Sequence, residues 1–487
     1  MCGIAGLLRF DGQQVDREEI KIILHKIMHR GRDHDGIELP DSFIGLGHRR
    51  LSIIDLNDHA SQPMFYANQR YCLTYNGEIY NYRQLRHFLQ EKAYQFTTQS
   101  DSEIILAAFD YWGEDCVKHF NGMFAFAIWD KHQRSLFCAR DQVGIKPFYY
   151  YKTDTFIAFA SEAFALTHFS QKKLNDDAVL AYFMSMYVAT EESIFKSIYK
   201  LAAGHTLTIN AQGKTALKRF WFIENFDEID AHTASVENLS FLIQQAIKRQ
   251  LQSDVPVGGF LSGGIDSGLI TALAAPEVKH YYTYSVGYEG MLNNELPYAK
   301  KIAERYHTKH TSIMITASDA MPYLNQALQQ SSEPIADSAI VATFMLSKLA
   351  AQDGVKVLLN GTGGDEIFAG YTRYTGQLSL KRKILLSLPS VLLKTLAHLP
   401  LQQKLISRLK HIEWDMLFST GGSFSLAQSL ISPTNFQLFL KKMMNELALS
   451  INQKIPNLYQ RMLFDLHHYL PNELLFLLDQ MTMAHTI

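Results

Sequence analysis

Cysteine is scarce in this chain of 487 residues. Its four copies, Cys2, Cys72, Cys116 and Cys138, are scattered and show no Cys-x-x-Cys spacing. Neither a disulfide framework nor a zinc site built from cysteines is therefore indicated, and such usage is typical of a reducing compartment. We expect a cytoplasmic location.

A strong net charge is also lacking. Lys and Arg number 46 and Asp and Glu 48, which gives a formal net charge of −2. Because binding to nucleic acid usually needs an excess of positive charge, we expect no nucleic-acid partner. Long apolar runs are missing too. The best candidate, residues 384–401, is interrupted by Pro389, Lys394 and Pro400, so stable membrane insertion is not expected.

The length and the order of patterns predict two domains. A chain of 487 residues is too long for one compact core. Residues 1–222 mix short β-rich runs with helical stretches, which indicates a layered α+β domain. The acidic, polar residues 223–234 are typical of a linker. Residues 235–487 alternate helix and apolar strand, which predicts an α/β domain with a parallel sheet and a helical subdomain near residues 378–470.

Individual elements can be assigned from periodicity. In the first domain we expect strands at residues 51–55, 71–76, 124–130, 135–141, 148–152 and 156–162, helices at residues 18–28, 82–90 and 103–112, and a closing hairpin at residues 204–213. In the second domain we expect a helix at residues 236–251 and a strand at residues 355–359.

Cys2 directly follows the initiator methionine. Removal of Met1 would leave a thiol and a free α-amine on one residue. An α-amine has an ordinary pKa of roughly 7.7 to 8.0, so it can accept the thiol proton near neutral pH, as in N-terminal nucleophile enzymes. Position alone favours a buried structural cysteine, since buried cysteines are common.

Four polar motifs lie where the expected strands meet loops. They are residues 29–33 (HRGRD), 48–55 (HRRLSIID), 75–81 (YNGEIYN) and 100–101 (SD). An arginine can hold an α-carboxylate through two parallel hydrogen bonds, and two acidic side chains can hold an α-ammonium. An Asn amide beside a Gly backbone N–H can form an oxyanion hole. These are the parts that hydrolysis of a glutamine side chain needs.

Together with residues 1–6 (MCGIAG), 122–130 (GMFAFAIWD) and 139–150 (ARDQVGIKPFYY), these motifs resemble the class II glutamine amidotransferase domain of asparagine synthetases. That resemblance implies an N-terminal nucleophile αββα sandwich, in which Cys2 forms a glutamyl thioester and releases ammonia. Asn76 and Gly77 would stabilise the oxyanion. One departure is Arg32, where the family usually has Pro, and we expect it to change only the local loop.

The resemblance also implies a set of glutamine-binding residues. They would be Arg50 at the carboxylate, Glu78 and Asp101 at the ammonium, and Leu51, Ser52, Ile53 and Ile54 beside them.

Two further loops carry glycines and acids. Residues 262–267 (SGGIDS) join an expected strand to an expected helix, where backbone N–H groups and the helix dipole can bind an anion. No Lys follows the glycines, so this is not a Walker A loop. Residues 360–366 (NGTGGDE) follow the strand at 355–359. In an open α/β sheet both loops would lie at the carboxyl edge, where ligands bind.

These loops resemble the SGGxDS and SGEGGDE motifs of the asparagine synthetase ATP-pyrophosphatase domain, which activates a carboxylate by adenylation. The resemblance implies ATP and Mg²⁺ as cofactors. The ATP-binding residues would be Ser262, Gly263, Gly264, Asp266 and Ser267 at the pyrophosphate, and Phe260, Val286, Asn360 and Gly361 at the nucleoside. Asp266 and Asp365 would bind the metal.

This chain also departs from that family. Thr362 stands at the position of a Glu used in forming the adenylate, and a hydroxyl cannot serve as a carboxylate base near pH 7. Leu478 and Gln480 stand at the positions of a Lys and an Arg. The family's last motif continues beyond Ile487, so we expect a synthetase domain truncated at its C-terminus.

The expected function is ATP-dependent amidation of aspartate through an aspartyl-adenylate, with ammonia taken from glutamine. The partners would be these small-molecule substrates, and the resemblance implies a homodimer. Two alternatives stay open. The acceptor could be another carboxylate, such as a sugar acid in polysaccharide synthesis, or the chain could be a glutaminase joined to a non-catalytic synthetase-like module.

Overall fold

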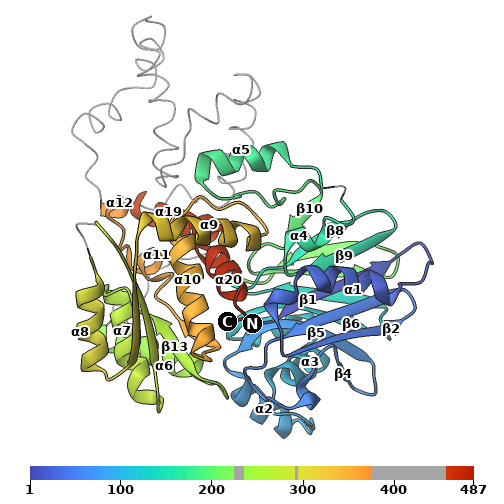
Figure 1. The fold of residues 1–487 in the computed structure, drawn as a ribbon. Helices are drawn as coiled ribbons and strands as arrows, with labels where there is room; N and C mark the ends of the chain where they lie inside the picture. Colours follow the sequence, from blue (N-terminus) through green and yellow to red (C-terminus); the bar gives the residue numbers. More distant parts are fainter. Residues whose placement is uncertain (171, 224–234, 291–293, 376–456) are drawn as a thin grey trace, which may run out of the picture.

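The computed structural model describes residues 1–170, 172–223, 235–290, 294–375 and 457–487 (Figure 1). The expected linker, apart from residue 223, and most of the expected helical subdomain lie outside these ranges. Within them, no helix is long and apolar enough to cross a membrane.

The N-terminal unit contains two six-stranded antiparallel sheets. The first has the order β10-β8-β9-β1-β3-β2 and the second the order β12-β11-β7-β6-β5-β4. The strands of the first sheet are β1 (Gly3–Arg9), β2 (His34–Asp41), β3 (Ile44–Arg50), β8 (Tyr149–Lys152), β9 (Phe156–Ala160) and β10 (Ile198–Lys200). Those of the second are β4 (Met64–Tyr66), β5 (Tyr71–Ile79), β6 (Gly122–Asp130), β7 (Ser135–Arg140), β11 (His205–Asn210) and β12 (Thr215–Arg219).

These sheets pack face to face and are covered by helices on their outer faces. Strand β6 shows why, because side chains alternate across a strand and both of its faces are apolar. Ala127 and Trp129 lie in the core between the sheets, whereas Phe126 and Ile128 pack beneath α2 (Tyr82–Glu91) and α3 (Asp101–Trp112). On the other side, α1 (Arg17–Lys26) and α4 (Ala163–Leu166) cover the first sheet. The predicted αββα sandwich is confirmed.

The second unit contains a four-stranded parallel sheet with the order β15-β14-β13-β16. Its strands are β13 (Val257–Phe260), β14 (Tyr282–Tyr288), β15 (Lys309–Ile315) and β16 (Val357–Leu359). Its helices are α6 (Val236–Gln250), α7 (Ile265–Ala274), α8 (Leu296–Arg305), α9 (Ala317–Gln330), α10 (Ala339–Gln352), α11 (Gly364–Phe368), α12 (Thr372–Thr375), α19 (Asn457–Phe464) and α20 (Leu475–Met483). Strand order reverses between β13 and β16, which creates a crevice at their carboxyl ends.

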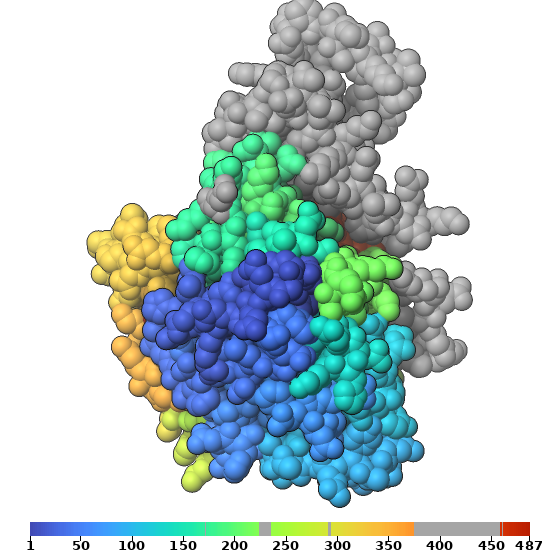
Figure 2. All heavy atoms as spheres, turned by 90° about the vertical axis from the view of Figure 1, so that its right-hand side faces the viewer, coloured from blue at the N-terminus to red at the C-terminus, as the bar shows by residue number. Residues whose placement is uncertain are grey.

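Both chain termini lie at the junction of the two units (Figure 1). Met1 and Ile53 of the first unit share a buried apolar cluster with Met483 of α20, and Val357 packs against it. The Thr486 hydroxyl donates to the His29 carbonyl oxygen at 2.9 Å. Seen from the side of the N-terminal unit, blue to green residues cover most of the face, and the second unit is visible in yellow and orange at its edge (Figure 2).

The prediction of a strand at residues 51–55 is wrong. β3 ends at Arg50, and the following residues form a loop whose backbone bonds leave the sheet. The Ser52 N–H donates to the Asp33 carboxylate at 2.8 Å, and the Ile53 carbonyl accepts from the Asp254 N–H of the second unit at 3.0 Å. Periodicity cannot anticipate such partners, because they come from elsewhere in the chain.

Candidate active sites

Cys2 lies just before β1 and is half-buried at the edge of the two-sheet core. Its backbone N–H donates to the Asn76 side-chain oxygen at 2.9 Å. Its sulfur accepts from the Leu51 N–H at 3.5 Å. Burial raises the pKa of the Cys2 thiol, and the positive charge of the neighbouring N-terminal amine opposes that rise. The thiol therefore needs an adjacent base to become a nucleophile near neutral pH.

A cavity with an empty volume of about 420 Å³ opens beside this sulfur. It is lined by Met1, Cys2, Arg50, Leu51, Ile53, Ile54, Ala60, Gln62, Tyr75, Gly77, Glu78, Ser100, Asp101 and Ser102. Nearly every residue that the resemblance implied for glutamine is thus brought together. Ser52 is absent from this wall, and its N–H bonds to Asp33 instead.

Two acidic side chains approach the cavity from different elements. Glu78 comes from β5, and Asp101 is the first residue of α3. Asp101 accepts from the Tyr75 hydroxyl at 2.8 Å and from the Ile79 N–H at 3.0 Å. One carboxylate oxygen of Glu78 has no partner among the described residues. Burial, followed by repulsion from Asp101, raises the pKa of Glu78 to about 8. The positive charge of a bound ammonium would favour the ionised carboxylate, and so offset both the burial and the repulsion.

Arg50 is held rigidly at the cavity wall. One terminal nitrogen of its guanidinium donates to the Asn57 carbonyl oxygen at 2.9 Å, and the other donates to the Asp55 carbonyl oxygen. These bonds orient the plane of a group whose remaining donors suit a carboxylate.

Asn76 and Gly77 lie on β5, directly beside the cysteine. The Asn76 side chain is fully buried, and its amide nitrogen has no partner among the described residues. A buried amide donor without a partner is costly, and a developing oxyanion would supply one. Glycine is required next to it, because a Cβ at Gly77 would lie 2.1 Å from the Met123 carbonyl oxygen.

The SGGIDS loop connects β13 to α7 at the crevice of the parallel sheet. The Ser262 and Ser267 hydroxyls are 2.9 Å apart, and the Gly264 N–H donates to the Ser262 hydroxyl at 3.2 Å. Gly263 has φ +93°, a conformation that favours glycine. No side chain caps the N-terminus of α7. That terminus is therefore open to an anion such as a phosphate.

The second acid-bearing loop packs against the first. Gly361 and Gly364 both border Asp266, since a Cβ at either position would lie 2.9 Å from an Asp266 side-chain atom. Burial and the nearby Asp365 carboxylate raise the pKa of Asp266. Among the described residues no group of three or more His, Cys, Asp or Glu side chains could hold a metal. The structure thus brings together two carboxylates, not a complete protein-made cage.

The remaining predicted ATP residues lie at the same edge of the sheet. Phe260 ends β13, Val286 belongs to β14, and their side chains pack against one apolar cluster. Asn360 directly follows β16, and its side-chain oxygen accepts from the Thr362 N–H at 2.9 Å. Thr362 is partly buried in this turn.

A second cavity, with an empty volume of about 630 Å³, lies between the two units. It is lined by Met1, Ile53, Glu78, Met123, Ile145, Lys146, Lys356, Val357, Leu358, Asn360, Leu475, Leu478, Asp479, Thr482 and Ile487. Met1, Ile53 and Glu78 line both cavities, so the pocket at Cys2 adjoins, at these side chains, a space that reaches Asn360.

Some residues of these walls were not anticipated from the sequence. Tyr75, Gln62 and Ser102 line the first cavity, and the Gln62 side chain bonds both the Tyr75 N–H and the Ser102 hydroxyl. Tyr75 lies within the motif at residues 75–81, but Gln62 follows a loop without any chemical signature. Only the packing of that loop against β5 could have identified it.

Comparison with known proteins assigns each of the two units to a family. Residues 1–221 match the family described as glutamine amidotransferase domain, and residues 238–487 match the family described as asparagine synthase. A putative glutamine-hydrolysing asparagine synthetase 2 of Methanocaldococcus jannaschii is 35% identical over 395 residues, which cover 76% of each chain. The glutamine-hydrolysing asparagine synthetase 1 of Bacillus subtilis is 32% identical over 511 residues, covering 100% of this chain and 78% of that protein.

Proposed function

Because this chain belongs to the family of glutamine-hydrolysing asparagine synthetases, we propose that its two cavities divide the family's reaction between them. Such an enzyme is an ATP-dependent ligase that amidates aspartate with ammonia from glutamine. We assign glutamine hydrolysis to residues 1–222 and ATP chemistry to residues 235–487. The observation that carries this division is the pair of neighbouring cavities, one at Cys2 and one reaching Asn360.

In the first unit, Cys2 is the nucleophile once Met1 has been removed. Its new α-amine takes the thiol proton, and the sulfur bonds to the carboxamide carbon of glutamine. The buried Asn76 amide donates to the oxyanion, with Gly77 allowing the close approach. The C–N bond then breaks and ammonia leaves with that proton. Water cleaves the thioester to release glutamate and restore the thiol.

Glutamine is held by charged groups on opposite sides of the cavity. The oriented guanidinium of Arg50 binds the α-carboxylate. The α-ammonium binds Glu78 and Asp101, whose crowding in a buried site favours a cation. Leu51, Ile53 and Ile54 supply the apolar wall along the glutamine side chain, and the backbone of Ser52 connects them.

In the second unit, the loop from Ser262 to Ser267 binds the phosphates of ATP. Phe260, Val286, Asn360 and Gly361 border the nucleoside. A carboxylate oxygen of aspartate attacks the α-phosphorus and pyrophosphate leaves. Ammonia then attacks the acyl carbon and AMP leaves. Thr362 is too weak a base to assist either step near pH 7, so its contribution is limited to hydrogen bonding.

Two adjacent carboxylates make this crevice suitable for Mg²⁺. Mg²⁺ in proteins is commonly held by one or two carboxylates together with substrate phosphates, which is the donor set that Asp266 and Asp365 provide beside the phosphate loop. Bound there, the metal would neutralise charge on the phosphates during transfer.

The cavity between the units supplies a passage for ammonia. Most of its lining is apolar, including Met123, Ile145, Val357 and Leu358, which disfavours protonation of ammonia on the way. Leu478, at the position of a family lysine, adds to this apolar wall. Because Met1 lines both cavities, its removal both frees the amine of Cys2 and widens the connection.

The test is ATP turnover by the purified chain. AMP and glutamate are measured with glutamine present, with and without aspartate, alongside a Cys2→Ala variant. We expect AMP formation that depends on aspartate, and loss of glutamate release in the variant while added ammonia still supports AMP formation. Glutamate release without aspartate-dependent AMP would overturn the assignment and favour another acceptor carboxylate or a glutaminase alone.

A further inference from the structure

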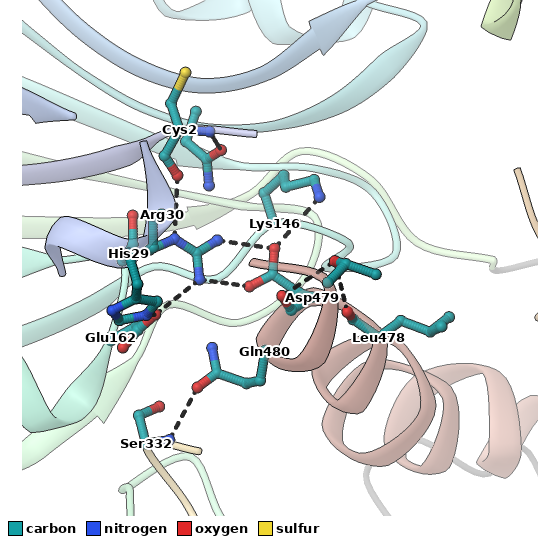
Figure 3. A network of polar contacts seen from close by, with 12 residues as sticks. Cys2, His29, Arg30, Lys146, Glu162, Ser332, Leu478, Asp479 and Gln480 are labelled. Atoms are coloured by element: carbon teal, nitrogen blue, oxygen red, sulfur yellow. Dashed lines mark hydrogen bonds and ion pairs between the residues drawn. The ribbon is translucent and has the colours of Figure 1, made fainter. Parts of the chain in front are cut away.

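Arg30 is a completely buried arginine that contacts the backbone of Cys2. Its Nε donates to the Cys2 carbonyl oxygen at 3.1 Å (Figure 3). Its side chain has no exposed surface. Two carboxylates hold the two ends of its guanidinium. One terminal nitrogen is 3.0 Å from Glu162, and the fork also meets both oxygens of Asp479, at 2.7 and 2.9 Å.

The two carboxylates come from different units of the protein. Glu162 follows β9 within the glutaminase unit. Asp479 lies on α20, and 449 positions separate it from Arg30 in sequence. The neighbouring residue Gln480 accepts from the Ser332 N–H at 2.9 Å, which ties the same helix to the second unit (Figure 3). The Asp479 side chain of the synthetase unit therefore contacts Arg30, which in turn contacts the backbone of Cys2.

Three basic side chains face the two carboxylates of this buried network. Lys146 approaches Asp479 at 3.4 Å, His29 approaches Glu162 at 2.8 Å, and Arg30 contacts both carboxylates. Burial opposes the charge on Asp479, but Arg30 and Lys146 outweigh it and lower the pKa of Asp479 to about 2. A buried arginine that lost one carboxylate would keep its charge, and its guanidinium would move to another position.

The position of Cys2 depends on its hydrogen bonds more than the position of an internal residue does. After removal of Met1, Cys2 is the end of the chain and is bonded to the protein on one side only. Its carbonyl bond to Arg30 and its nitrogen bond to Asn76 then orient the residue. Displacing a reacting group by about 1 Å can cost about a hundredfold in rate.

We propose that Asp479 is a positioning residue for glutamine hydrolysis, which from the synthetase unit holds Arg30 on the carbonyl oxygen of Cys2. The proposal rests on the proposed role of Cys2 as the nucleophile. It means that the glutaminase site is complete only when α20 is docked. Ammonia is then released efficiently only where a passage to the second site exists.

The test compares Asp479→Asn with Asp465→Asn in the full chain. Asp465 is also buried and pairs with the partly exposed Arg373 at 2.8 Å, but within the second unit. Glutamate release is measured without ATP. For Asp479→Asn we expect kcat to fall by about 10- to 100-fold with KM for glutamine within about twofold, because Asp479 does not line the glutamine cavity. Asp465→Asn keeps the original kcat. Asp479→Glu, which retains the charge, recovers part of the loss.

Double variants separate positioning from general instability. If Asp479 acts through Arg30, the pair Arg30→Ala with Asp479→Ala hydrolyses glutamine no more slowly than Arg30→Ala alone. Ammonia-dependent AMP formation in each variant reports that the second unit is folded. Additive losses, an unchanged kcat in Asp479→Asn, or an equal loss in Asp465→Asn would overturn the proposal. Glutamine hydrolysis that survives Cys2→Ala would instead overturn the proposed function.

Discussion

Replacing Glu78 by Gln tests whether a buried carboxylate governs glutamine capture. Glu78 has a pKa of about 8 in the free site, because burial and Asp101 both disfavour its charge. Only the ionised form can bind an ammonium strongly. With that pKa, about 1% of the sites are ionised at pH 6, about 9% at pH 7 and half at pH 8.

The magnitude follows from these fractions. Ionisation of Glu78 alone makes kcat/KM for glutamine rise about ninefold between pH 6 and pH 7, in addition to the effect of the Cys2 amine. In Glu78→Gln this ninefold contribution disappears, so the logarithm of kcat/KM rises by about one unit less over the same interval. At pH 8 the loss of a charge-assisted bond, roughly 1.5–3 kcal/mol, lowers kcat/KM about 10- to 150-fold.

The assay is glutamate release without ATP at pH 6 to 8. A matched control is Glu473→Gln, because burial also raises the pKa of Glu473 to about 8, but this residue follows α19 in the second unit and does not line the glutamine cavity. That variant should keep the pH profile of the original chain. A Glu78→Gln profile as steep as the original between pH 6 and pH 7 would refute the reasoning.

Three other changes test separate parts of the structure. Met123→Trp should narrow the cavity between the units, so that glutamate is still released but less asparagine forms per glutamate, whereas Met123→Leu keeps the original ratio. Gly361→Ala should lower AMP formation at least tenfold by displacing Asp266, with glutamine hydrolysis unchanged and Gly268→Ala on α7 as the milder control. Asp479→Asn should lower the free energy of unfolding by about 3–5 kcal/mol at pH 7, since among the described residues it leaves the buried Lys146 without a carboxylate and Arg30 with Glu162 alone. Because the pKa of Asp479 is lowered to about 2, this difference, measured by urea unfolding, should shrink as pH falls from about 4 toward 2.

Much of the fold was accessible from the pattern of residues. The layered first unit, the parallel sheet of the second and the family itself are confirmed, and α6 lies close to its predicted position. The hairpin predicted at residues 204–213 does form, but its second strand, β12, lies beyond that range. Local patterns succeed where an element's own residues decide its structure. The roles of the site residues, the domain boundaries, the metal and a homodimer stay predictions.

The misplaced strand has a clear physical cause. Residues 51–55 have the composition of a strand, but their backbone partners are Asp33 and Asp254, so they form a wall of the glutamine cavity. Here partners distant in sequence outweighed the local preference. Ser52 lies in the same loop, and its role at glutamine stays a prediction.

Short segments of the sequence therefore determine which chemical groups the sites contain. They do not determine how those groups are assembled. A cysteine beside the initiator methionine, a serine- and glycine-rich loop before a helix, and acids after a strand each predict a reactive or binding group, because neighbouring residues are covalently held together. The contact of Asp479 with Arg30, and the sharing of Met1 and Glu78 by two cavities, join segments hundreds of residues apart. Only the packing of α20 between the units brings them together, since burial of apolar surface and charge pairing depend on which distant surfaces meet.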